Sequence, residues 1–407
     1  MIGEWLLPSD WKWTHIEGIA ASNKYSVVDG PFGSNLKTSD YVDDGIPVLQ
    51  GKNITNNVFR WFDARFISEG KAEELKRSAV SIGDILIVKI GSIGYAAELD
   101  DLNGYPFAII PANLAKLTID DSKIDKGYLL HWLASPHVSR HFNSVASKTA
   151  QPALSLGKIK ELPIPLPPLP EQKRIAAILD KADAIRRKRQ QAIQLADELL
   201  SAQFLKKFGD PKDSPFGSKS LKDVALKITD GAHFTPTYVE SGIPFLRVTD
   251  INGGGVDWSK VKYIPLEEHQ ELIKRCKPEK GDVLYSKNGT IGVPRLIDWD
   301  QEFSIFVSLC LIKPNPDYLR GRYLYSFLQT PFALKQATQK AKSATVTNLH
   351  LVEIKEIRLP VPSLAIQDEW IDFLDNFGCV KARLIESLNN SNDAFNSLSQ
   401  KAFSGML

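Results

Sequence analysis

The stretch that decides the fold reads Leu166-Pro-Pro-Leu-Pro-Glu-Gln-Lys-Arg-Ile175, and no Gly or Pro follows until Gly209. After the prolines, a carboxylate and an amide suit the free N–H groups of a helix start. Apolar residues then recur at helical spacing, and some stand seven apart, which is typical of a coiled coil: Ile178, Ile185, Ala192 and Leu199. About 38 residues predict a rod of roughly 55 Å. We interpret this rod as a spacer, because it is too long for one domain to bury.

The composition bounds the class of protein. The 407 residues are enough for two or three domains, and 43% apolar residues are enough for proper cores. The net charge of +2 predicts that any nucleic-acid surface is a local patch. Cys276, Cys310 and Cys379 are too far apart for a disulfide framework or a zinc site, which favours a reducing compartment. With no signal peptide and no long apolar run, we expect a soluble, cytoplasmic protein.

A tandem repeat with a period of about 197 residues runs through the chain. Three glycine-containing motifs in the first half return in the second: Gly45–Pro47 as Gly242–Pro244, Gly83–Leu86 as Gly281–Leu284, and Gly91–Gly94 as Gly289–Gly292. The match is spread over the half-chain, so each half is one structural unit.

Each half is expected to be a mixed α+β domain followed by a long helix. We expect strands within Ile82–Ile90 and Asp282–Tyr285, and helices over Lys126–Phe142 and Gly321–Lys340. The predicted boundaries are a first globular domain at 1–160, a central spacer helix at 161–210, a second globular domain at 211–355 and a C-terminal spacer helix at 356–407.

The two long helices are expected to pair. If the halves are equivalent, the second helix runs back toward the first domain, so the rods form an antiparallel coiled coil. The first rod carries an excess of basic residues and the second an excess of acidic ones. Opposite charges add little stability, but they help to choose the partner and its direction. The predicted product has two pseudo-symmetric globular domains separated by two long antiparallel coiled-coil helices.

These motifs resemble a known family. Leu166–Ile175 at the start of a long helix, Asp44–Leu49, Gly83–Leu86 and the Gly91–Gly94 loop are similar to type I restriction–modification specificity (S) subunits. The resemblance implies two target recognition domains, each reading one half of a bipartite DNA site, and helices that set the gap. It also implies two methyltransferase (M) subunits and restriction (R) subunits as partners. S-adenosylmethionine, ATP and Mg would be bound by those partners, and this chain would hold no cofactor.

One segment departs from the family pattern. After Asn389 the chain is rich in Ser and Asn, and Pro362–Gln367 lacks the Glu that precedes Gln172. This departure predicts that the second helix docks less well or frays at its end.

Polar side chains on turn-rich loops are the candidates for reading base edges, which needs amide, guanidinium, ammonium or hydroxyl groups. Four loops per half offer them. In the first half they are Ser34, Asn35, Lys37, Gln50, Lys52, Asn53, Lys89, Ser92, Lys148, Thr149 and Gln151. In the second half they are His233, Thr235, Arg247, Thr249, Lys287, Asn288, Thr290, Lys342, Ser343, Thr345 and Asn348. The alternative is that such residues are merely solvated.

Two of these candidates stand out. Lys89 and Lys287 precede the glycine loop at matching repeat positions, and we expect them to contact phosphate more than bases. The glycine loop itself resembles a GxxG nucleotide clamp, although two glycines in a hairpin turn explain it equally well. Because the loops of the two halves differ while the framework repeats, we expect an asymmetric target.

The basic run Arg186, Arg187, Lys188 and Arg189 has three interpretations: a solvated helix face, a docking site for the methyltransferase subunit, or a DNA phosphate contact. Aromatic residues at helical spacing in the second rod, Trp370, Phe373 and Phe377, are interpreted as core rather than as a base-stacking platform.

Catalysis by the chain itself has little support. Asn315-Pro316-Asp317-Tyr318 differs from the Asn-Pro-Pro-Tyr motif of adenine methyltransferases, and no glycine-rich methyl-donor turn precedes it. Asp317 with Glu353 and Lys355 could hold Mg²⁺ as in a nuclease. His137 and His141 have zinc-ligand spacing without a third ligand. We favour a non-catalytic DNA specificity subunit; the alternatives are a stand-alone DNA-modifying enzyme with degenerate motifs and a pure dimerisation scaffold.

Overall fold

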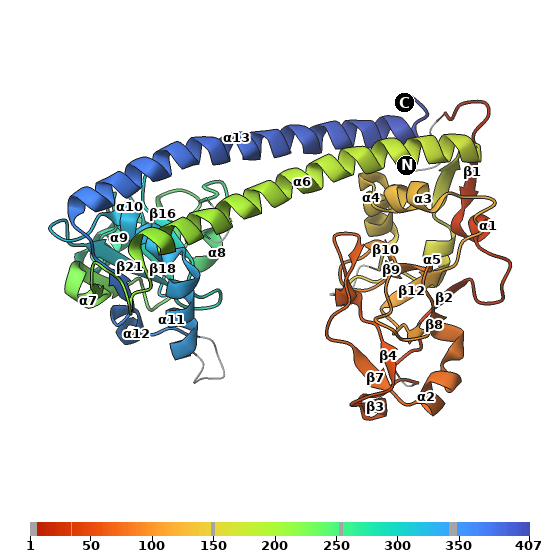
Figure 1. The fold of residues 1–407 in the computed structure, drawn as a ribbon, viewed down its shortest axis with the longest axis horizontal. Coiled ribbons are helices and arrows are strands. Elements are labelled where there is room, and N and C mark those ends of the chain that lie inside the picture. The colour runs from red at the N-terminus through yellow and green to blue at the C-terminus, as the bar shows by residue number, and fades with distance from the viewer. Residues whose placement is uncertain (1–5, 34, 148–150, 252–254, 342–347) are drawn as a thin grey trace. The chain divides into compact units, whose positions relative to one another are not determined.

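The computed structural model describes residues 6–33, 35–147, 151–251, 255–341 and 348–407, which form two compact units (Figure 1). Unit 1 comprises Met1–Arg189 and Ser387–Leu407, and unit 2 comprises Gln190–Glu386. Two long helices belong to both. Helix α6 (Leu169–Phe208) begins in unit 1 and ends in unit 2, and α13 (Leu364–Phe403) begins in unit 2 and ends in unit 1. The two long helices expected from the sequence are therefore confirmed.

Unit 1 contains two main sheets, with strand orders β10-β9-β12-β2 and β3-β7-β4-β11-β8. Its strands are β1 (Lys12–His15), β2 (Val27–Asp29), β3 (Tyr41–Val42), β4 (Ile46–Val48), β5 (Ile54–Thr55), β6 (Val58–Phe59), β7 (Arg65–Ile67), β8 (Ala79–Val80), β9 (Ile85–Val88), β10 (Ala96–Glu98), β11 (Ala108–Ile109), β12 (Leu114–Leu117) and β13 (Pro163–Leu166). Its shorter helices are α1 (Ile16–Ile19), η1 (Thr38–Asp40), η2 (Gly51–Asn53), α2 (Glu69–Glu74), η3 (Lys76–Ser78), α3 (Lys126–Leu133), α4 (Pro136–Val145) and α5 (Leu156–Lys160).

Unit 2 has sheets of order β15-β21-β18-β19 and β17-β16-β20. Its strands are β14 (Ser218–Ser220), β15 (Ala225–Asp230), β16 (Ile243–Leu246), β17 (Lys262–Ile264), β18 (Val283–Ser286), β19 (Pro294–Leu296), β20 (Ser304–Ile305), β21 (Leu309–Pro314) and β22 (Arg358–Pro360). Its shorter helices are α7 (Leu221–Val224), α8 (Val248–Ile251), α9 (Leu266–Arg275), α10 (Gly321–Leu328), α11 (Pro331–Ala341) and α12 (Leu351–Lys355).

The two units share the core of one topology, as the repeat predicts, although the second sheet has five strands in unit 1 and three in unit 2. The sheet β10-β9-β12-β2 corresponds strand for strand to β19-β18-β21-β15, and β4 pairs in parallel with β11 as β16 does with β20. The repeated glycines mark places that a side chain would block. Gly45 and Gly242 have φ of +149° and +159°, and an added Cβ would lie 2.3 Å from the carbonyl oxygen of Ile67 and 2.4 Å from that of Ile264. Both sites therefore require glycine.

The helices expected over Lys126–Phe142 and Gly321–Lys340 are each broken in two. In unit 1, Ser135 caps α4 through a hydrogen bond from Val138 N, and Pro136 stands at the first helical position. In unit 2, Thr330 and Pro331 do the same at the start of α11. A proline inside a helical pattern removes an N–H donor and ends the preceding helix. Helices are therefore present over both expected ranges, and each range is interrupted at its proline.

Each long helix begins at a buried glutamine that is fixed to its globular unit. In α6, Gln172 accepts a hydrogen bond from Asp125 N (2.7 Å) and donates to Lys123 O (3.2 Å) and Pro167 O (2.8 Å). In α13, Gln367 bonds Arg320 N (2.9 Å), Tyr318 O (2.8 Å) and Pro362 O (3.0 Å) in the same way. In each glutamine both amide N–H groups donate and the amide oxygen accepts one hydrogen bond, which leaves one lone pair of the oxygen unused. Three hydrogen bonds therefore fix the start of each helix to its domain.

Each long helix also ends in a core. Phe208 of α6 is fully buried in unit 2, against Tyr323 and Trp370. Phe403 of α13 is fully buried in unit 1, where its ring packs edge-on against Tyr128 and Trp132. The expectation of a frayed end after Asn389 was therefore wrong. The Ser and Asn residues occupy the helix, and the aromatic side chain that follows them anchors it.

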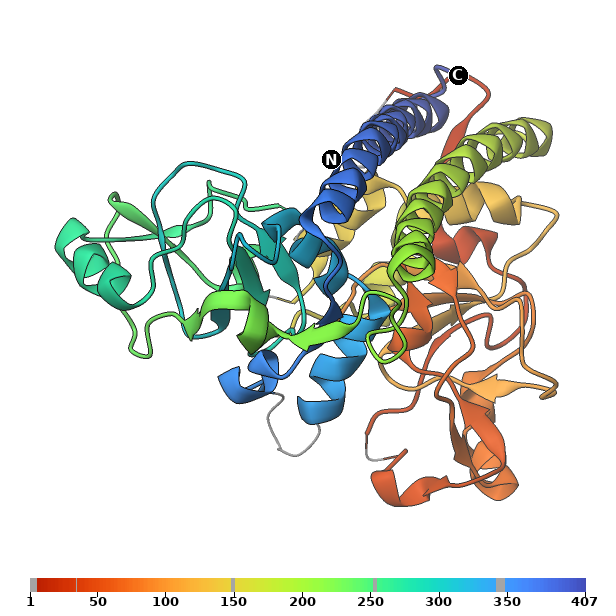
Figure 2. The ribbon, with the colours of Figure 1, turned by 60° about the vertical axis from the view of Figure 1, so that its left-hand side comes forward.

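Within each unit the segments of α6 and α13 run in opposite directions. In unit 1, Arg174 Nη2 donates to Leu407 O (3.1 Å) and Arg189 Nη1 donates to Ser387 O (3.0 Å). In unit 2, Figures 1 and 2 show the end of α6 beside the beginning of α13, where Lys207 pairs with Glu369 (3.1 Å). The pairing of a basic with an acidic helix agrees with the charge pattern.

The seam of α6 differs from the predicted one. Ile185 and Leu199, two of the predicted seam residues, are 50% and 49% exposed. The set one position later is Leu179, Arg186, Ile193 and Leu200. It is the more buried set at three of the four places, whereas Ala192 and Ile193 are both half-buried. Seven-residue spacing is satisfied by both sets, so the spacing alone could not choose between them.

None of the helices in the described ranges is long and apolar enough to span a bilayer.

Candidate nucleic-acid interface

In unit 1 the loops proposed from the sequence gather around one buried ion pair. Lys89 Nζ, at the end of β9, lies 2.6 Å from Asp29 Oδ2 at the end of β2. The backbone of Lys89 donates to Asn113 O and accepts from Leu154 N, so it holds the loops before β12 and α5. Gly51 lies against the side chain of Asn113, which brings the loop after β4 to the same place.

Unit 2 repeats this arrangement. Lys287 Nζ lies 3.1 Å from Asp230 Oδ2, and its backbone donates to Ser308 O and accepts from Leu349 N. Ser308 Oγ accepts from Val248 N (3.2 Å) and so ties down the loop after β16. In both units, five segments that are far apart in sequence meet at one end of the framework.

The two lysines are placed differently from our expectation. Lys89 and Lys287 are only 6% exposed, and each ammonium group is bonded to a buried carboxylate. A lysine that neutralises a buried aspartate is not free to bind a phosphate. We therefore interpret both lysines as anchors. Lys89 joins the loop after β9 to the loop after β2, and Lys287 joins the loop after β18 to the loop after β15.

The carboxylate in unit 2 is strongly surrounded by cations. Burial alone would raise the pKa of Asp230, but hydrogen bonds from His233, Lys287 and Arg275 outweigh burial and lower the pKa below its ordinary value. The carboxylate is thus ionised at neutral pH.

The other candidates of unit 1 fall into two groups. Asn53 is buried and spends its side chain on Arg60 O (3.0 Å), Phe62 O (2.9 Å) and Gln50 N (2.8 Å), so it shapes the loop. Lys52 is paired with Asp63, and Gln151 is exposed but engaged in the fold. The fully exposed side chains are those of Asn35, Lys37 and Ser92.

In unit 2 the exposed candidates are His233, Thr235, Thr249 and Thr290. Arg247 is half-buried and makes two hydrogen bonds to Asp250 (3.1 and 3.0 Å). With Thr249, Asp250 and Lys260 it lines an open cavity of about 780 Å³. The remaining candidates, Ser34, Lys148, Thr149, Lys342, Ser343 and Thr345, lie outside the described residues.

Buried amide groups without partners occur where the loops meet. Within the described residues, Gln50 Nε2 and Asn113 Oδ1 in unit 1, and Asn288 Oδ1 and Asn348 Oδ1 in unit 2, are buried without a hydrogen-bond partner. An unpaired buried polar atom costs about 1–3 kcal/mol. Asparagine and glutamine are also the side chains that pair with adenine in the major groove.

Five residues that the structure brings to this place were not among the sequence candidates: Asp29, Arg77, Asn113, Asp230 and Arg275. Arg77 Nη2 lies 3.3 Å from Asp29 Oδ1, and Arg275 Nη1 lies 3.0 Å from Asp230 Oδ1. The two arginines stand 198 positions apart, the same offset as Lys89 and Lys287. Aligning the two halves position by position would have found them.

The comparison with known families decides what this framework is. The model of the type I restriction modification DNA specificity domain matches the chain twice, over residues 8–195 and 214–391. This chain belongs to that family.

Specificity subunits from Escherichia coli are among its relatives. The chain is 24% identical over 332 residues to the type I restriction enzyme EcoBI specificity subunit, which covers 74% of this chain and 69% of that protein. It is 23% identical over 395 residues to the EcoKI specificity subunit of strain K12, covering 90% and 83%. A chain solved in a study of complex assembly and conformational transition of the type I R-M system shares its fold, with a TM-score of 0.57, 17% identity, and 99% and 100% coverage.

In this member of the specificity family the basic run on α6 is used inside unit 1. Arg186 and Arg187 both bond Asp183, Arg186 stacks on the ring of Phe395 (4.6 Å), and Arg189 bonds Ser387 O. These contacts hold α13 against α6. Docking of a partner to Arg186, Arg187, Lys188 and Arg189 stays a prediction.

The residues considered for catalysis have structural contacts. Glu353 caps α12 by accepting a hydrogen bond from His350 N (2.8 Å), and Asp317 N donates to Asn315 in a turn (3.0 Å). His137 lies against Trp132 and bonds Arg140 (3.1 Å). Among the described residues, no three His, Cys, Asp or Glu side chains are grouped to hold a metal ion. Of the predicted aromatic set, Trp370 is confirmed as core, at 2% exposure, whereas Phe373 is 38% exposed and its assignment to the core was wrong.

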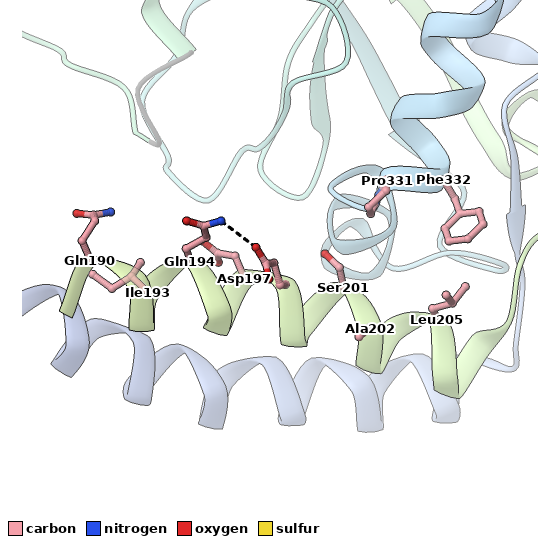
Figure 3. Close-up of a pocket in the computed structure, with 10 residues that line it drawn as sticks. Gln190, Ile193, Gln194, Asp197, Ser201, Ala202, Leu205, Pro331 and Phe332 are labelled. Carbon is pink, nitrogen blue, oxygen red and sulfur yellow. Dashed lines mark hydrogen bonds between the residues drawn. The ribbon is translucent and has the colours of Figure 1, made fainter. Parts of the chain in front are cut away.

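A groove of about 670 Å³ runs along the second half of α6 in unit 2 (Figure 3). Ile193, Ala202 and Leu205 line it from the helix, and Pro331 and Phe332 at the start of α11 close one end. Gln194, hydrogen-bonded to Glu198 (2.9 Å), lies on its rim. The groove is mainly apolar.

Proposed function

We propose that this chain is the DNA-reading subunit of a type I restriction–modification enzyme and that each unit reads one half of a bipartite, asymmetric target. One observation carries the proposal. The two units share the strand order of one sheet, the glutamine that fixes the start of the long helix, and the buried ion pair. The loops that meet beside the ion pair differ in sequence. Identical frameworks with different loops suit two different half-sites.

Several groups at the loops suit contact with bases. The exposed candidates carry hydroxyl, amide, ammonium and imidazole groups, which can bond base edges. Gln50, Asn113, Asn288 and Asn348 add amide atoms that lack a partner within the described chain. We propose that these amides and the exposed loop residues read the target, and that Lys89, Lys287 and Asn53 position the loops.

We also propose that the chain performs no chemistry itself and works through partners. Methyltransferase and restriction subunits would supply catalysis, with S-adenosylmethionine, ATP and Mg as their cofactors. Support comes from exposed apolar residues on α6, where Leu195 is 54% and Leu199 49% exposed, and from the groove at Phe332. An uncovered apolar helix face suits a protein partner.

The decisive experiment locates methylated adenines across a genome in cells that express this chain with a methyltransferase subunit. We expect methylation at one motif with two unequal halves and a fixed gap. Exchanging residues 1–160 for those of a relative should then change one half of the motif only. A change in both halves would contradict the assignment of one half-site to each unit.

The enzyme alternative is tested separately. Purified chain without partners is expected to leave DNA unmodified and uncut. Turnover by the chain alone that disappears in the double variant Asp317→Asn, Glu353→Gln, with DNA binding retained, would favour the alternative. Absence of any sequence preference in the presence of partners would instead favour the scaffold interpretation.

A further inference from the structure

An Asp–Lys–Arg cluster occurs in both units. In unit 1 it consists of Asp29, Lys89 and Arg77, and in unit 2 of Asp230, Lys287 and Arg275. In both units the lysine bonds Oδ2 of the aspartate and the arginine bonds Oδ1, and in unit 2 His233 Nε2 also lies 3.0 Å from Asp230 Oδ1. Such agreement in atoms as well as residues indicates one role kept in both copies.

The arginine is the accessible member of the cluster. The side chains of Arg77 and Arg275 are 58% and 51% exposed, whereas those of the lysines and aspartates are at most 11% exposed. One carboxylate with two cations leaves a net charge of +1, and the buried lysine already neutralises the aspartate. The surplus charge therefore resides on a guanidinium group at the surface.

The backbone under the two arginines differs. Arg77 belongs to the short η3, whereas Arg275 is the last residue of α9. Both nevertheless reach the aspartate that ends β2 or β15, directly before the first recognition loop. Arg275 also donates to Gly231 O, the first residue of that loop. Two different local structures thus deliver a guanidinium to one place.

The loops beside the cluster differ completely, Pro31–Asn35 in one unit and Ala232–Pro236 in the other. A group that is the same in both units cannot distinguish two half-sites. It suits the part of DNA that is the same at every site, the phosphate backbone. Guanidinium has five N–H donors, and the contacts to Asp and Gly leave at least three for a phosphate, which arginine binds in bidentate fashion.

We propose that Arg77 and Arg275 each bind a DNA backbone phosphate, independently of sequence, at equivalent places beside the two sets of recognition loops. The inference rests on the proposed function. The buried Asp–Lys pair holds the guanidinium in place before DNA arrives, so little side-chain freedom is lost on binding.

The test is the salt dependence of DNA binding by the full chain with its methyltransferase subunits. Each phosphate contact contributes about 0.9 to the slope of log K against log salt. Arg77→Gln and Arg275→Gln should each lower the slope by about one and the double variant by about two. Affinity should fall on the order of tenfold on target and on scrambled duplex alike. Arg→Lys variants should keep the slope and lose only part of the affinity.

The neighbours Lys76 and Lys274 provide matched controls. Both are exposed and paired with Glu73 or Glu271 three positions earlier, without a bond to the aspartate. Lys76→Gln and Lys274→Gln remove the same charge and should change the slope by much less. Melting temperatures show which variants are folded, and Arg→Lys gives a second measurement if Arg→Gln unfolds.

Two outcomes would overturn the proposal. One is an unchanged slope in folded Arg77→Gln and Arg275→Gln, or a slope equal to that of the lysine controls. The other is a loss confined to the target duplex, which would make the arginines base readers. Failure of the proposed function looks different, because the wild-type complex itself would then bind target and scrambled duplex equally.

Discussion

The two ends of each globular unit differ in how strictly the repeat is kept. Where the long helix starts, Gln172 and Gln367 make the same three hydrogen bonds to backbone groups at the same spacings. Where the loops meet, the Asp–Lys–Arg cluster and the backbone hydrogen bonds of its lysine are shared, whereas the exposed residues around them differ. The contacts at the helix start are the same in both units, whereas the loops present different side chains above the same buried ion pair.

This contrast has a physical reason. A buried amide or ion pair must have all its partners, so a change at the helix start or in the cluster costs stability. An exposed loop side chain has water as an alternative partner, so it can change freely. The same chain can therefore keep its geometry while its target preference varies.

Removing the buried lysine should have the largest effect. Lys89→Met leaves a buried carboxylate with one exposed arginine, and Lys287→Met leaves one with an arginine and His233. We expect a loss of about 3–5 kcal/mol in unfolding free energy. Urea denaturation measures it, with the exposed Lys76→Met as the control. A folded Lys89→Met protein of wild-type stability that has lost DNA binding would instead make Lys89 a contact residue.

The second-largest effect is expected from removing the aromatic rings at the ends of the long helices. Phe403→Ala and its repeat equivalent Phe208→Ala each remove a fully buried ring and should lower the unfolding free energy by about 3–4 kcal/mol. Phe208 is supported by a second aromatic, Phe204 (ring centroids 4.7 Å apart), where the other unit has Ser399. Differential scanning calorimetry should show both losses. A negligible effect of Phe403→Ala would restore the frayed end that the sequence indicated.

Removing the glutamine that fixes the start of a long helix should lower the unfolding free energy by about 2–3 kcal/mol. Gln172→Leu or Gln367→Leu leaves one backbone N–H and two carbonyl groups unpaired in the interior. Gln191→Leu on the exposed face of α6 is the matched control. If the glutamine also fixes the helix direction, these variants should accept DNA targets with altered gaps between the half-sites. An unchanged gap preference in a destabilised variant would limit the role of the glutamine to stability.

Changing the exposed loops should leave stability within about 0.5 kcal/mol. Asn35→Ala in unit 1 and Thr235→Ala in unit 2 should instead weaken discrimination at one half-site by about 1–3 kcal/mol. Competition binding against duplexes with one altered half measures this. Equal losses at both half-sites would argue against one unit per half-site.

The smallest expected effect is on acid stability. The lowered pKa of Asp230 means that its contribution is complete above the ordinary aspartate pKa and is lost as pH falls through its lower, folded-state value. Burial raises the pKa of Asp282, so protonation of that group stabilises the folded state as the pH falls. Asp230→Asn should flatten the acid limb of a urea-midpoint profile, whereas Asp282→Asn should steepen it. Parallel shifts in both variants would contradict these opposite signs.

Much of the architecture followed from sequence pattern. Proline punctuation, helical spacing and a repeat are local or regular signals, so the long helices and the twin α+β units could be predicted. The seam of α6 could not, because Ile185 and Ile193 are equally apolar and only packing decides which is covered. The breaks at Pro136 and Pro331 have a local signal, because a proline ends the helix that precedes it.

The site was predicted only as a set of loops. Sequence could mark Lys89 and Lys287 as repeated, but not that each lies against an aspartate about 60 residues earlier. Nor could it show that the remaining charge rests on Arg77 and Arg275. Such pairings depend on which strand ends are neighbours, and that is a property of the sheet.

By itself, then, the sequence determined that there are two equivalent halves, that each continues into a stiff helix, and which loops carry polar groups. Only the tertiary structure decided which of those polar groups are buried as anchors and which face outward. The reason is that burial belongs to the packed whole, since a lysine on a loop becomes an anchor when a distant carboxylate is placed beside it.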